Sequence, residues 1–378
     1  MKRVVFLMMI LTLLLTGCSL VPNEYASSRP HETEQIVRPE AAEVKSYEEL
    51  TDAILDIIKL GAEEGSIRAV GYDGNVEEDL VKAVYEVARQ TPVGAYAVDY
   101  INHSCARIVN YYEIRLSVTY RRSGREIASI QQAYTPEQMQ GQVARGLMTY
   151  ADRLAMQITE DQQYDMAAIV AKYCGENPAH MVEIPQIAVS VYPDSGKERI
   201  VEVEFFYEHS PEELDEMKKA LEESISAAAE YIRYRNSDRD KMQLLYTYLT
   251  ERFTYKKAVG TTPVYSALCE GIADPMGLSR ALKLICDKAG VACSTVSGLR
   301  DGETYHWNIV SDDGDFRHMD LYECIMDSHG LHLKTDWQMD RYYWNTQEYP
   351  ACVVKEEPVQ EEALPTPEPE DTEKEELP

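Results

Sequence analysis

Two stretches of similar pattern occupy residues 46–210 and constrain the fold more than any other feature of the chain. In each, two helix-like segments come before two segments of alternating apolar residues. Pro92 and Pro178 take matching places, which sets the offset between the stretches at 86 residues. We therefore predict two related α+β modules, over residues 46–133 and 134–210.

The period of the apolar residues indicates where the elements of each module lie. Within a predicted strand, every second side chain is apolar, as in a strand with one buried face. The expected elements are helices over 47–65, 76–92, 137–158 and 164–178, and strands over 94–101, 111–121, 186–193 and 199–209. The residues expected on the buried faces are Ile114, Leu116 and Val118 in the first module and Val201, Val203 and Phe205 in the second. Because His103, Cys105 and His180 are scattered, we expect spacing or binding from these modules, not catalysis.

Two further helices are expected after the modules. Ser210 followed by Pro211 is a typical helix start, and apolar residues then recur at helical spacing to about Tyr234. A second helix is expected from about Asp238. The apolar faces of both helices are interpreted as parts of a core.

The first residues have the pattern of a bacterial lipoprotein signal. Lys2 and Arg3 come before a short apolar run, which ends in LTGC at Cys18. We predict a signal peptide over residues 1–17, a diacylglyceryl thioether on Cys18, and a flexible tether over 18–45. The mature protein would then be anchored to the cell membrane on its extracytoplasmic face.

Charge and composition restrict the partners. The formal net charge is −28, which disfavours nucleic acid as a partner. Residues 354–378 are acidic, rich in proline and free of aromatic side chains, so we expect them to be disordered. The partners that remain are the membrane, through the lipid, and a peptide or cell-wall ligand.

The cysteines give no clear disulfide framework. The chain has eight, and the spacing of the seven besides Cys18 fits no known pairing pattern. Cys286 and Cys293 could pair across the end of one helix and the start of the next strand, but we interpret them as buried thiols. No CxxC or HxxxH pattern is present, so we predict neither a metal nor another cofactor.

A helix is expected over residues 275–289, with clear signals at both ends. Asp274 is a good N-cap, and Pro275 suits the first helical position because its missing N–H would have no partner there. Gly290 suits a left-handed C-cap. If the helix began at Cys269 instead, Pro275 would lie inside it and cost roughly 3 kcal/mol.

The last third of the chain resembles the transglutaminase-like superfamily, relatives of the papain-like cysteine peptidases. The resemblance rests on the order of two segments, VYSALCEGIADPMGLSRALKLICDKAGVACSTVSG and YHWNIVSDDGDFRHMDLYEC, and most specifically on WNIV…DG…HMD. It implies an α+β fold in which a helix packs on an antiparallel sheet. With the two leading helices, this transglutaminase-like domain is expected over residues 211–353.

The resemblance also implies a catalytic cysteine, histidine and aspartate. In such a site a helix N-terminus and an imidazolium lower the thiol pKa, and a carboxylate orients the histidine. The candidates here are Cys269, His306 and Asp320. If all three act, the protein is a cysteine peptidase or acyltransferase that acts on peptide amides.

Two of the family's three positions fall on other residues. The nucleophile's place, at the start of the helix, falls on Pro275, and Cys269 lies six residues upstream. The histidine's place, two residues before Trp307, falls on Tyr305, while His306 points to the opposite strand face. Only Asp320 stands where the pattern requires. We therefore favour a domain that is catalytically degenerate and binds peptide or cell wall, and we keep the active enzyme as the alternative.

The remaining polar and aromatic residues have less specific interpretations. His318 could replace the missing base, but it is more simply a structural residue. The aromatic segment near the end is expected to cover the core, although an exposed subset could bind glycan or peptide. Its members are Trp337, Tyr342, Tyr343, Trp344 and Tyr349.

Overall fold

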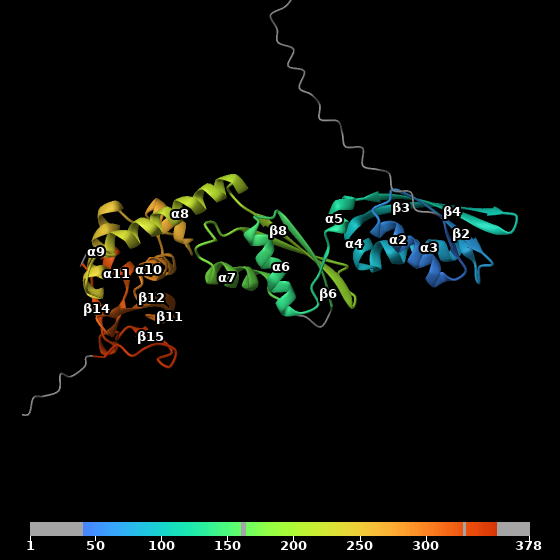
Figure 1. Cartoon of the computed structure of the whole chain (residues 1–378). Coiled ribbons are helices and arrows are strands. Elements are labelled where there is room, and N and C mark those ends of the chain that lie inside the picture. The colour runs from blue at the N-terminus through green and yellow to red at the C-terminus, as the bar shows by residue number, and fades with distance from the viewer. Residues whose placement is uncertain (1–40, 160–163, 328–329, 354–378) are drawn as a thin grey trace, which may run out of the picture. The chain divides into compact units, whose positions relative to one another are not determined.

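The computed structural model describes residues 41–159, 164–327 and 330–353 (Figure 1). The predicted signal peptide, Cys18, the tether up to residue 40 and the acidic tail lie outside these residues. Among the residues described, no helix combines the length and the apolar character needed to span a bilayer.

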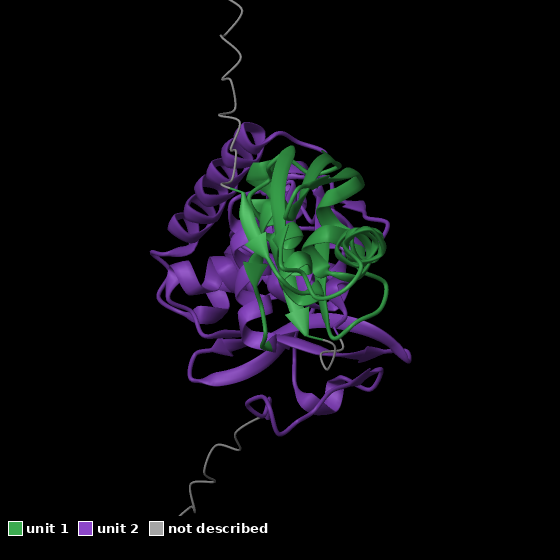
Figure 2. Cartoon of the chain, turned by 90° about the vertical axis from the view of Figure 1, so that its right-hand side faces the viewer, with its two compact units in different colours: residues 1–135, 155–162, 190–202 green, residues 136–154, 163–189, 203–378 purple. Residues whose placement is uncertain are grey.

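The described residues divide into two compact units (Figure 2). Unit 1 takes its residues from 1–135, 155–162 and 190–202, and unit 2 takes the rest. The boundary between the two units passes through strands of the second predicted module. It therefore lies inside that module and not at its expected end, residue 210. The predicted domain limits therefore stay predictions.

The first module forms a four-stranded sheet with the order β1-β2-β4-β3. Strands β1 and β2 are parallel, and the other neighbours are antiparallel. Its elements are β1 (Ala42–Val44), α2 (Tyr47–Lys59), β2 (Glu64–Val70), α3 (Val76–Gln90), α4 (Pro92–Ala97), β3 (Val98–Ile108) and β4 (Tyr111–Tyr120).

The core of unit 1 lies between this sheet and its helices. Ser46 and Asn75 cap α2 and α3 by accepting hydrogen bonds from backbone N–H groups of their first turns. The predicted buried face of β4 is confirmed, because Ile114, Leu116 and Val118 pack with apolar residues of α2 and α3. The opposite face of the sheet is polar.

The second module has a similar succession of strands and helices, without a counterpart of α4, and the strand order β5-β6-β8-β7. As in the first sheet, its first two strands are parallel. That the two modules are copies of one unit stays a prediction. Strand β5 (Gln131–Gln132) joins this sheet although it lies before residue 134, the predicted start of the module, and α5 (Gly124–Ala128) comes just before β5. The other elements are α6 (Pro136–Met148), β6 (Arg153–Thr159), α7 (Met166–Glu176), β7 (Gln186–Tyr192) and β8 (Glu198–Phe206).

The structure corrects two expectations within the modules. Strand β6 occupies the end of the segment 137–158, which was expected to be one long helix, because a seven-residue stretch fits either period. Strand β2 begins where the expected helix over 47–65 ends, and it was not predicted. Residues 94–97, expected in a strand, belong to α4. Thr91 caps that helix and Pro92 begins it, a start signal that the alternating pattern obscured.

Unit 2 contains a five-stranded antiparallel sheet with the order β14-β13-β12-β11-β15. Helix α10 packs against β11 and β12, which gives the predicted helix on an antiparallel sheet. From α8 onward the elements are α8 (Pro211–Ile232), α9 (Asp238–Arg252), β9 (Lys256–Lys257), η1 (Ser266–Glu270), β10 (Ile272–Ala273), α10 (Pro275–Ala289), β11 (Cys293–Arg300), β12 (Glu303–Asp312), β13 (Asp315–Met319), α11 (Leu321–Met326), β14 (Leu333–Lys334), η2 (Asp336–Gln338) and β15 (Tyr342–Tyr343).

The two faces of this sheet are covered differently. Helices α8, α9 and α10 share a large apolar core with one face, through residues such as Val310 of β12. Trp307 belongs to the other face and packs with Met339, Tyr342 and Cys352 from the last residues described. The predicted starts of α8 at Pro211 and of α9 at Asp238 are both confirmed.

Candidate functional site

Helix α10 begins at Pro275 and ends at Ala289, as the sequence predicts. Asp274 has extended backbone geometry and caps the helix, and Gly290 ends it at a φ of 71°. In the family that the sequence resembles, this helix start would present the nucleophile. In this chain the first residue of the helix is Pro275, whose side chain supplies no nucleophile.

The N–H groups at the start of α10 are directed at a carboxylate of the chain itself. Asp274 accepts hydrogen bonds from the backbone N–H groups of Met276 at 3.2 Å and Gly277 at 3.0 Å. Thr262 adds its backbone N–H at 3.1 Å and its hydroxyl at 2.7 Å. A Cβ at Gly277 would lie only 2.7 Å from the Thr262 hydroxyl oxygen, so the glycine allows this close packing. Because Asp274 receives four donors, the positive end of the helix is already neutralised.

Cys269 lies in the short helical turn η1, six residues before Pro275. Its sulfur is 3.6 Å from the hydroxyl oxygen of Ser224 on α8. Burial raises the pKa of the Cys269 thiol, and the hydrogen bond with Ser224 only partly offsets this. Among the described residues, the hydrogen bonds of His306 and Asp320 go to groups other than Cys269. The charge of Arg252 also lowers the pKa of Cys269, but burial outweighs it, and the thiol has neither an imidazole partner nor a place at the start of α10 to activate it.

His306 faces α10, which the sequence did not reveal. Asn308, two residues further along β12, donates a hydrogen bond to the Ser279 carbonyl of α10 at 2.9 Å. Residues two apart in a strand share a face, so the side chain of His306 also faces the helix. Burial lowers the pKa of His306, and the charge of Arg280 on α10 lowers it further. The ring Nδ1 is 3.2 Å from the Ser297 hydroxyl. The imidazole is thus kept neutral.

Tyr305 shares the face of Trp307, as predicted, but that face points away from α10. Its hydroxyl donates to Asp320 at 3.3 Å, and its ring packs edge-on against Tyr342. Asp320 also accepts a hydrogen bond from the Tyr342 hydroxyl at 2.7 Å and from Arg300 at 3.4 Å. Burial raises the pKa of Asp320. Asp320 therefore accepts hydrogen bonds from two tyrosines and an arginine.

The charges around Asp320 neutralise one another. Arg300 reaches Glu323 with its second terminal nitrogen at 2.9 Å, and Lys334 contacts the same carboxylate at 2.7 Å. The backbone N–H of Glu323 donates to Asp320 at 2.9 Å, which caps α11. Two carboxylates thus face two cations. The cluster has the character of a buried structural network, and it offers no unpaired acid or base for proton transfer.

His318 is fully buried, and both of its ring nitrogens are engaged. Trp307 donates its indole N–H to Nδ1 at 2.9 Å, and Nε2 lies 2.8 Å from a carboxylate oxygen of Asp336. An indole nitrogen can only donate, so Nδ1 is an acceptor and Nε2 carries the hydrogen. Burial lowers the pKa of His318. This histidine is structural and does not replace a catalytic base.

His318, Asp336 and Cys352 are the described residues that come nearest to a metal site, with their ligand atoms within 4.8 Å of one another. Ligation through Nε2 would move the ring hydrogen to Nδ1, where it would face the Trp307 N–H. The donor set does not fit a metal unless that hydrogen bond breaks. Cys352 also donates its backbone N–H to Asp336, which ties the segment together without an ion.

The aromatic segment divides into a covered and an exposed part. Tyr342 is buried, and Trp344 and Tyr349 pack against the same apolar cluster, so the predicted capping role is confirmed for them. Trp337 is 77% exposed and Tyr343 is 63% exposed. Tyr343 of β15 stands opposite Leu299 of β11, which is itself 41% exposed.

The cysteines in the described part of the chain are all free thiols. Cys286 and Cys293 are buried, as predicted. The hydrogen bond between their thiols, together with burial, raises the pKa of Cys286 well above its ordinary value.

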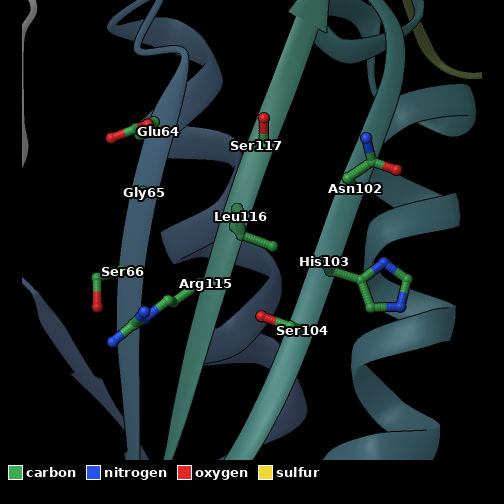
Figure 3. A pocket seen from close by; sticks show the side chains of 9 residues that line it. All are labelled: Glu64, Gly65, Ser66, Asn102, His103, Ser104, Arg115, Leu116 and Ser117. Carbon is green, nitrogen blue, oxygen red and sulfur yellow. The ribbon is translucent and has the colours of Figure 1, made fainter.

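Unit 1 carries a shallow cavity of about 610 Å³ on the polar face of its sheet. Figure 3 shows the residues that line it from β2, β4 and β3, among them Ser66, Arg115, Asn102 and His103. In this view Asn102 and His103 extend from β3 on the side away from β4. The cavity has no buried charged group, and we assign it no chemistry.

Comparison with known proteins finds only remote structural similarities. No protein-family model matches the chain, and no curated protein does. A solved TGase is similar at 12% identity and a TM-score of 0.26, over 63% of this chain and 66% of that one. A proposed protease from Parabacteroides distasonis is similar at 8% identity and a TM-score of 0.23, over 56% and 47%. The chain spans under two thirds of each, and likenesses this remote carry no argument about the site.

Proposed function

We propose that this chain is a lipid-anchored bacterial protein on the extracytoplasmic face of the cell membrane. Its transglutaminase-like region binds peptide or cell wall and does not catalyse thiol chemistry. One observation carries the proposal: α10 starts at Pro275, and the Asp274 carboxylate takes up the free N–H groups at that start. A nucleophile or a substrate oxyanion would need the place that this carboxylate fills.

Two further contacts support the loss of catalysis. The Cys269 sulfur has a serine hydroxyl as its hydrogen-bond neighbour, and burial favours the neutral thiol. Asp320 is committed to Tyr305, Tyr342 and Arg300, so its carboxylate does not orient an imidazole. Restoring the triad would require changes in two separate elements of the fold, at Pro275 in α10 and at Tyr305 in β12.

The exposed aromatics supply the candidate binding surface. Trp337 and the Tyr343–Leu299 pair present apolar area to solvent on the last described segment and on β11. Aromatic side chains stack well on the apolar faces of sugars and on peptide planes, and their polar edges remain hydrated. Both ligand classes are abundant at the outer face of a bacterial membrane, where we place the protein.

One observation favours the alternative, an active cysteine peptidase or acyltransferase that acts through Cys269, His306 and Asp320. His306 faces α10, on the side where such a site would lie. However, its neutral ring has no carboxylate partner among its hydrogen bonds; Ser297 is the neighbour of Nδ1. We therefore rank this alternative second.

Binding and catalysis can be separated with one set of variants. We expect the purified protein to pellet with isolated peptidoglycan, and Trp337→Ala and Tyr343→Ala to weaken this at least several-fold. Tyr234→Ala is the matched control, because Tyr234 is 76% exposed but lies elsewhere, beyond the end of α8. Cys269→Ser should bind like the parent protein. If the parent hydrolyses or transfers peptide amides and Cys269→Ser does not, the non-catalytic proposal is wrong.

The anchoring part of the proposal has its own test. Cys18→Ser removes the thiol that would carry the lipid, so we expect the variant to leave the membrane fraction or to keep its signal peptide. Labelling with a radioactive fatty acid should give a band in the parent and none in the variant. A variant that stays membrane-bound at the mature mass would contradict lipid anchoring.

A further inference from the structure

Strand β3 is an open edge of the sheet in unit 1. With the order β1-β2-β4-β3, it pairs with β4 on one side and with no described strand on the other. It is long, running from Val98 to Ile108, and most of its residues are exposed. Natural edge strands are usually short or blocked by proline, lysine or a central bulge. In β3 the one irregularity falls on Asp99, between Val98 and Tyr100, and Arg89 already occupies the Asp99 carbonyl, so the regular stretch that is open to pairing begins at Tyr100.

An exposed apolar stripe on α3 runs beside this edge. Glu77, Val81, Tyr85 and Arg89 follow one another at four-residue spacing and so share one face of the helix. Both ends of the stripe reach β3: Arg89 donates to the Asp99 carbonyl at 2.8 Å, and the charge of Glu77 acts on Cys105. Between them, Val81 is 57% exposed and Tyr85 is 62% exposed.

The edge is self-complementary in one register. If a second β3 pairs antiparallel with the first about a twofold axis at His103, residues 100–106 of the two copies pair, and the Asp99 side chain of each copy lies at the end of the paired stretch, next to Arg107 of the other. In this register no two side chains of the same permanent charge face each other. A shift by one residue in either direction places Asp99 opposite Ala106 or Ile108, and both ion pairs are lost.

The stripe on α3 is self-complementary in the same sense. Because α3 runs antiparallel to β3, the same axis turns Glu77 towards Arg89 of the second copy and Val81 towards Tyr85 of the second copy. The spacings agree: Glu77 to Arg89 is about 18 Å along a helix, and Cys105 to Asp99 is about 20 Å along a strand. Helix and strand therefore present the same twofold pattern side by side.

We propose that unit 1 is a homodimerisation surface in which two copies join their β3 edges, antiparallel and centred on His103, to form one continuous eight-stranded sheet. The backbone groups of the two edges pair, the Asp99–Arg107 contacts fix the register, and Val81 and Tyr85 supply apolar area. This inference does not depend on what the transglutaminase-like region does.

The axis residue gives a direct test. Directly opposed residues of antiparallel strands have Cα atoms about 4.5–5.5 Å apart, which suits a disulfide. His103→Cys in the full chain, oxidised mildly with copper phenanthroline in membranes, should therefore yield mostly covalent dimer. Native Cys105 would lie about 13 Å from its copy, so the parent chain should give no such band. Ser117→Cys, exposed on neighbouring β4, is the matched control and should not cross-link.

Charge reversal tests the register. In the His103→Cys background, Asp99→Lys or Arg107→Glu sets two like-charged pairs opposite each other and should lower the cross-linking yield about tenfold. Asp99→Lys together with Arg107→Glu restores opposite charges and should recover the yield. Circular dichroism of each variant distinguishes a lost dimer from a lost fold.

Each outcome decides the proposal. The proposal is supported if His103→Cys cross-links and if the variant with both Asp99→Lys and Arg107→Glu recovers the cross-linking yield. If a well-folded His103→Cys chain does not cross-link and sediments as a monomer, the edge is not a self-interface, and pairing with a strand of a different protein becomes the explanation. Equal cross-linking at positions 103 and 117 would reflect random collision and would equally overturn the proposal.

Discussion

The start of α10 in unit 2 and the edge strand β3 in unit 1 differ in whether their free backbone groups have hydrogen-bond partners within the chain. At α10 the exposed N–H groups are met by Asp274, and the carboxylate is held in turn by Thr262. At β3 a row of N–H and C=O groups has no neighbouring strand in the described chain. Backbone groups that have protein partners stabilise a fold, and groups left open are available to bind another chain.

This difference reverses the expectation from the sequence. The motifs of the C-terminal region point to chemistry, yet the carboxylates of Asp274 and Asp320 are satisfied within the chain. The N-terminal modules contain no motif, yet they expose an edge and an apolar stripe. A catalytic pattern in the sequence therefore does not by itself locate the surface that acts.

The largest effect should come from the Asp320 cluster. Asp320→Ala leaves Arg300, Tyr305 and Tyr342 buried without their acceptor, so we expect a loss of about 3 kcal/mol in unfolding free energy. Urea denaturation measures it. Asp320→Asn keeps an acceptor oxygen and should cost clearly less. If both variants unfold like the parent protein, the cluster is not the structural network described above.

The cap of α10 should give the next effect. Asp274→Ala removes the acceptor for the N–H groups of Met276 and Gly277 and should destabilise the protein by about 1–2 kcal/mol. Asp274→Ser retains a capping oxygen and should recover most of that loss. Equal stability of the alanine and serine variants would show that the cap contributes nothing.

A substitution in the turn that joins β3 to β4 should raise the stability of the protein, unlike the two substitutions above. Val109 has a φ of 39° and is 93% exposed, so this β-branched residue is strained and packs against almost nothing. We expect Val109→Gly to stabilise the protein by roughly 1 kcal/mol. The midpoint of urea unfolding measures the change. A loss of stability would mean that the hairpin end of the edge makes contacts that we have not identified.

The pH dependence of stability should be the smallest effect. Burial lowers the pKa of His318 and also of His306, so the unfolded chain takes up protons at a higher pH than the folded chain. Unfolding free energy should therefore fall as the pH drops through about 6.5 and level off below the folded-state pKa values. His318→Asn keeps an acceptor for the Trp307 N–H and should flatten this slope. If the slope of unfolding free energy against pH is the same in His318→Asn, groups other than His318 cause the pH dependence.

Local signals in the sequence predicted the parts of the fold that local physics controls. Asp274, Pro275 and Gly290 fixed both ends of α10, and Ser210 with Pro211 fixed the start of α8. Strand β6 was taken for the end of a helix because seven residues are too few to separate a period of two from a helical period, and β2, just after the first expected helix, was not predicted. Their identity depends on the sheet that they join.

The candidate site could be predicted only in part, for a similar reason. Strand alternation placed His306 and Trp307 on opposite faces, but which face meets α10 depends on tertiary packing. The partners of Asp320 could not be foreseen either, because Arg300 and Tyr342 lie 20 and 22 residues away along the chain. No short motif encodes such a network.

The reactivity of Cys269 tests the central claim most directly. We would alkylate the folded protein with iodoacetamide across a pH series and follow the Cys269 peptide by mass spectrometry, in the parent protein and in His306→Ala. Because burial raises the thiol pKa, we predict slow labelling that grows only in alkaline solution, with the same profile in both proteins. Rapid, stoichiometric labelling at pH 6 that is lost in His306→Ala would show an activated thiol and contradict the account.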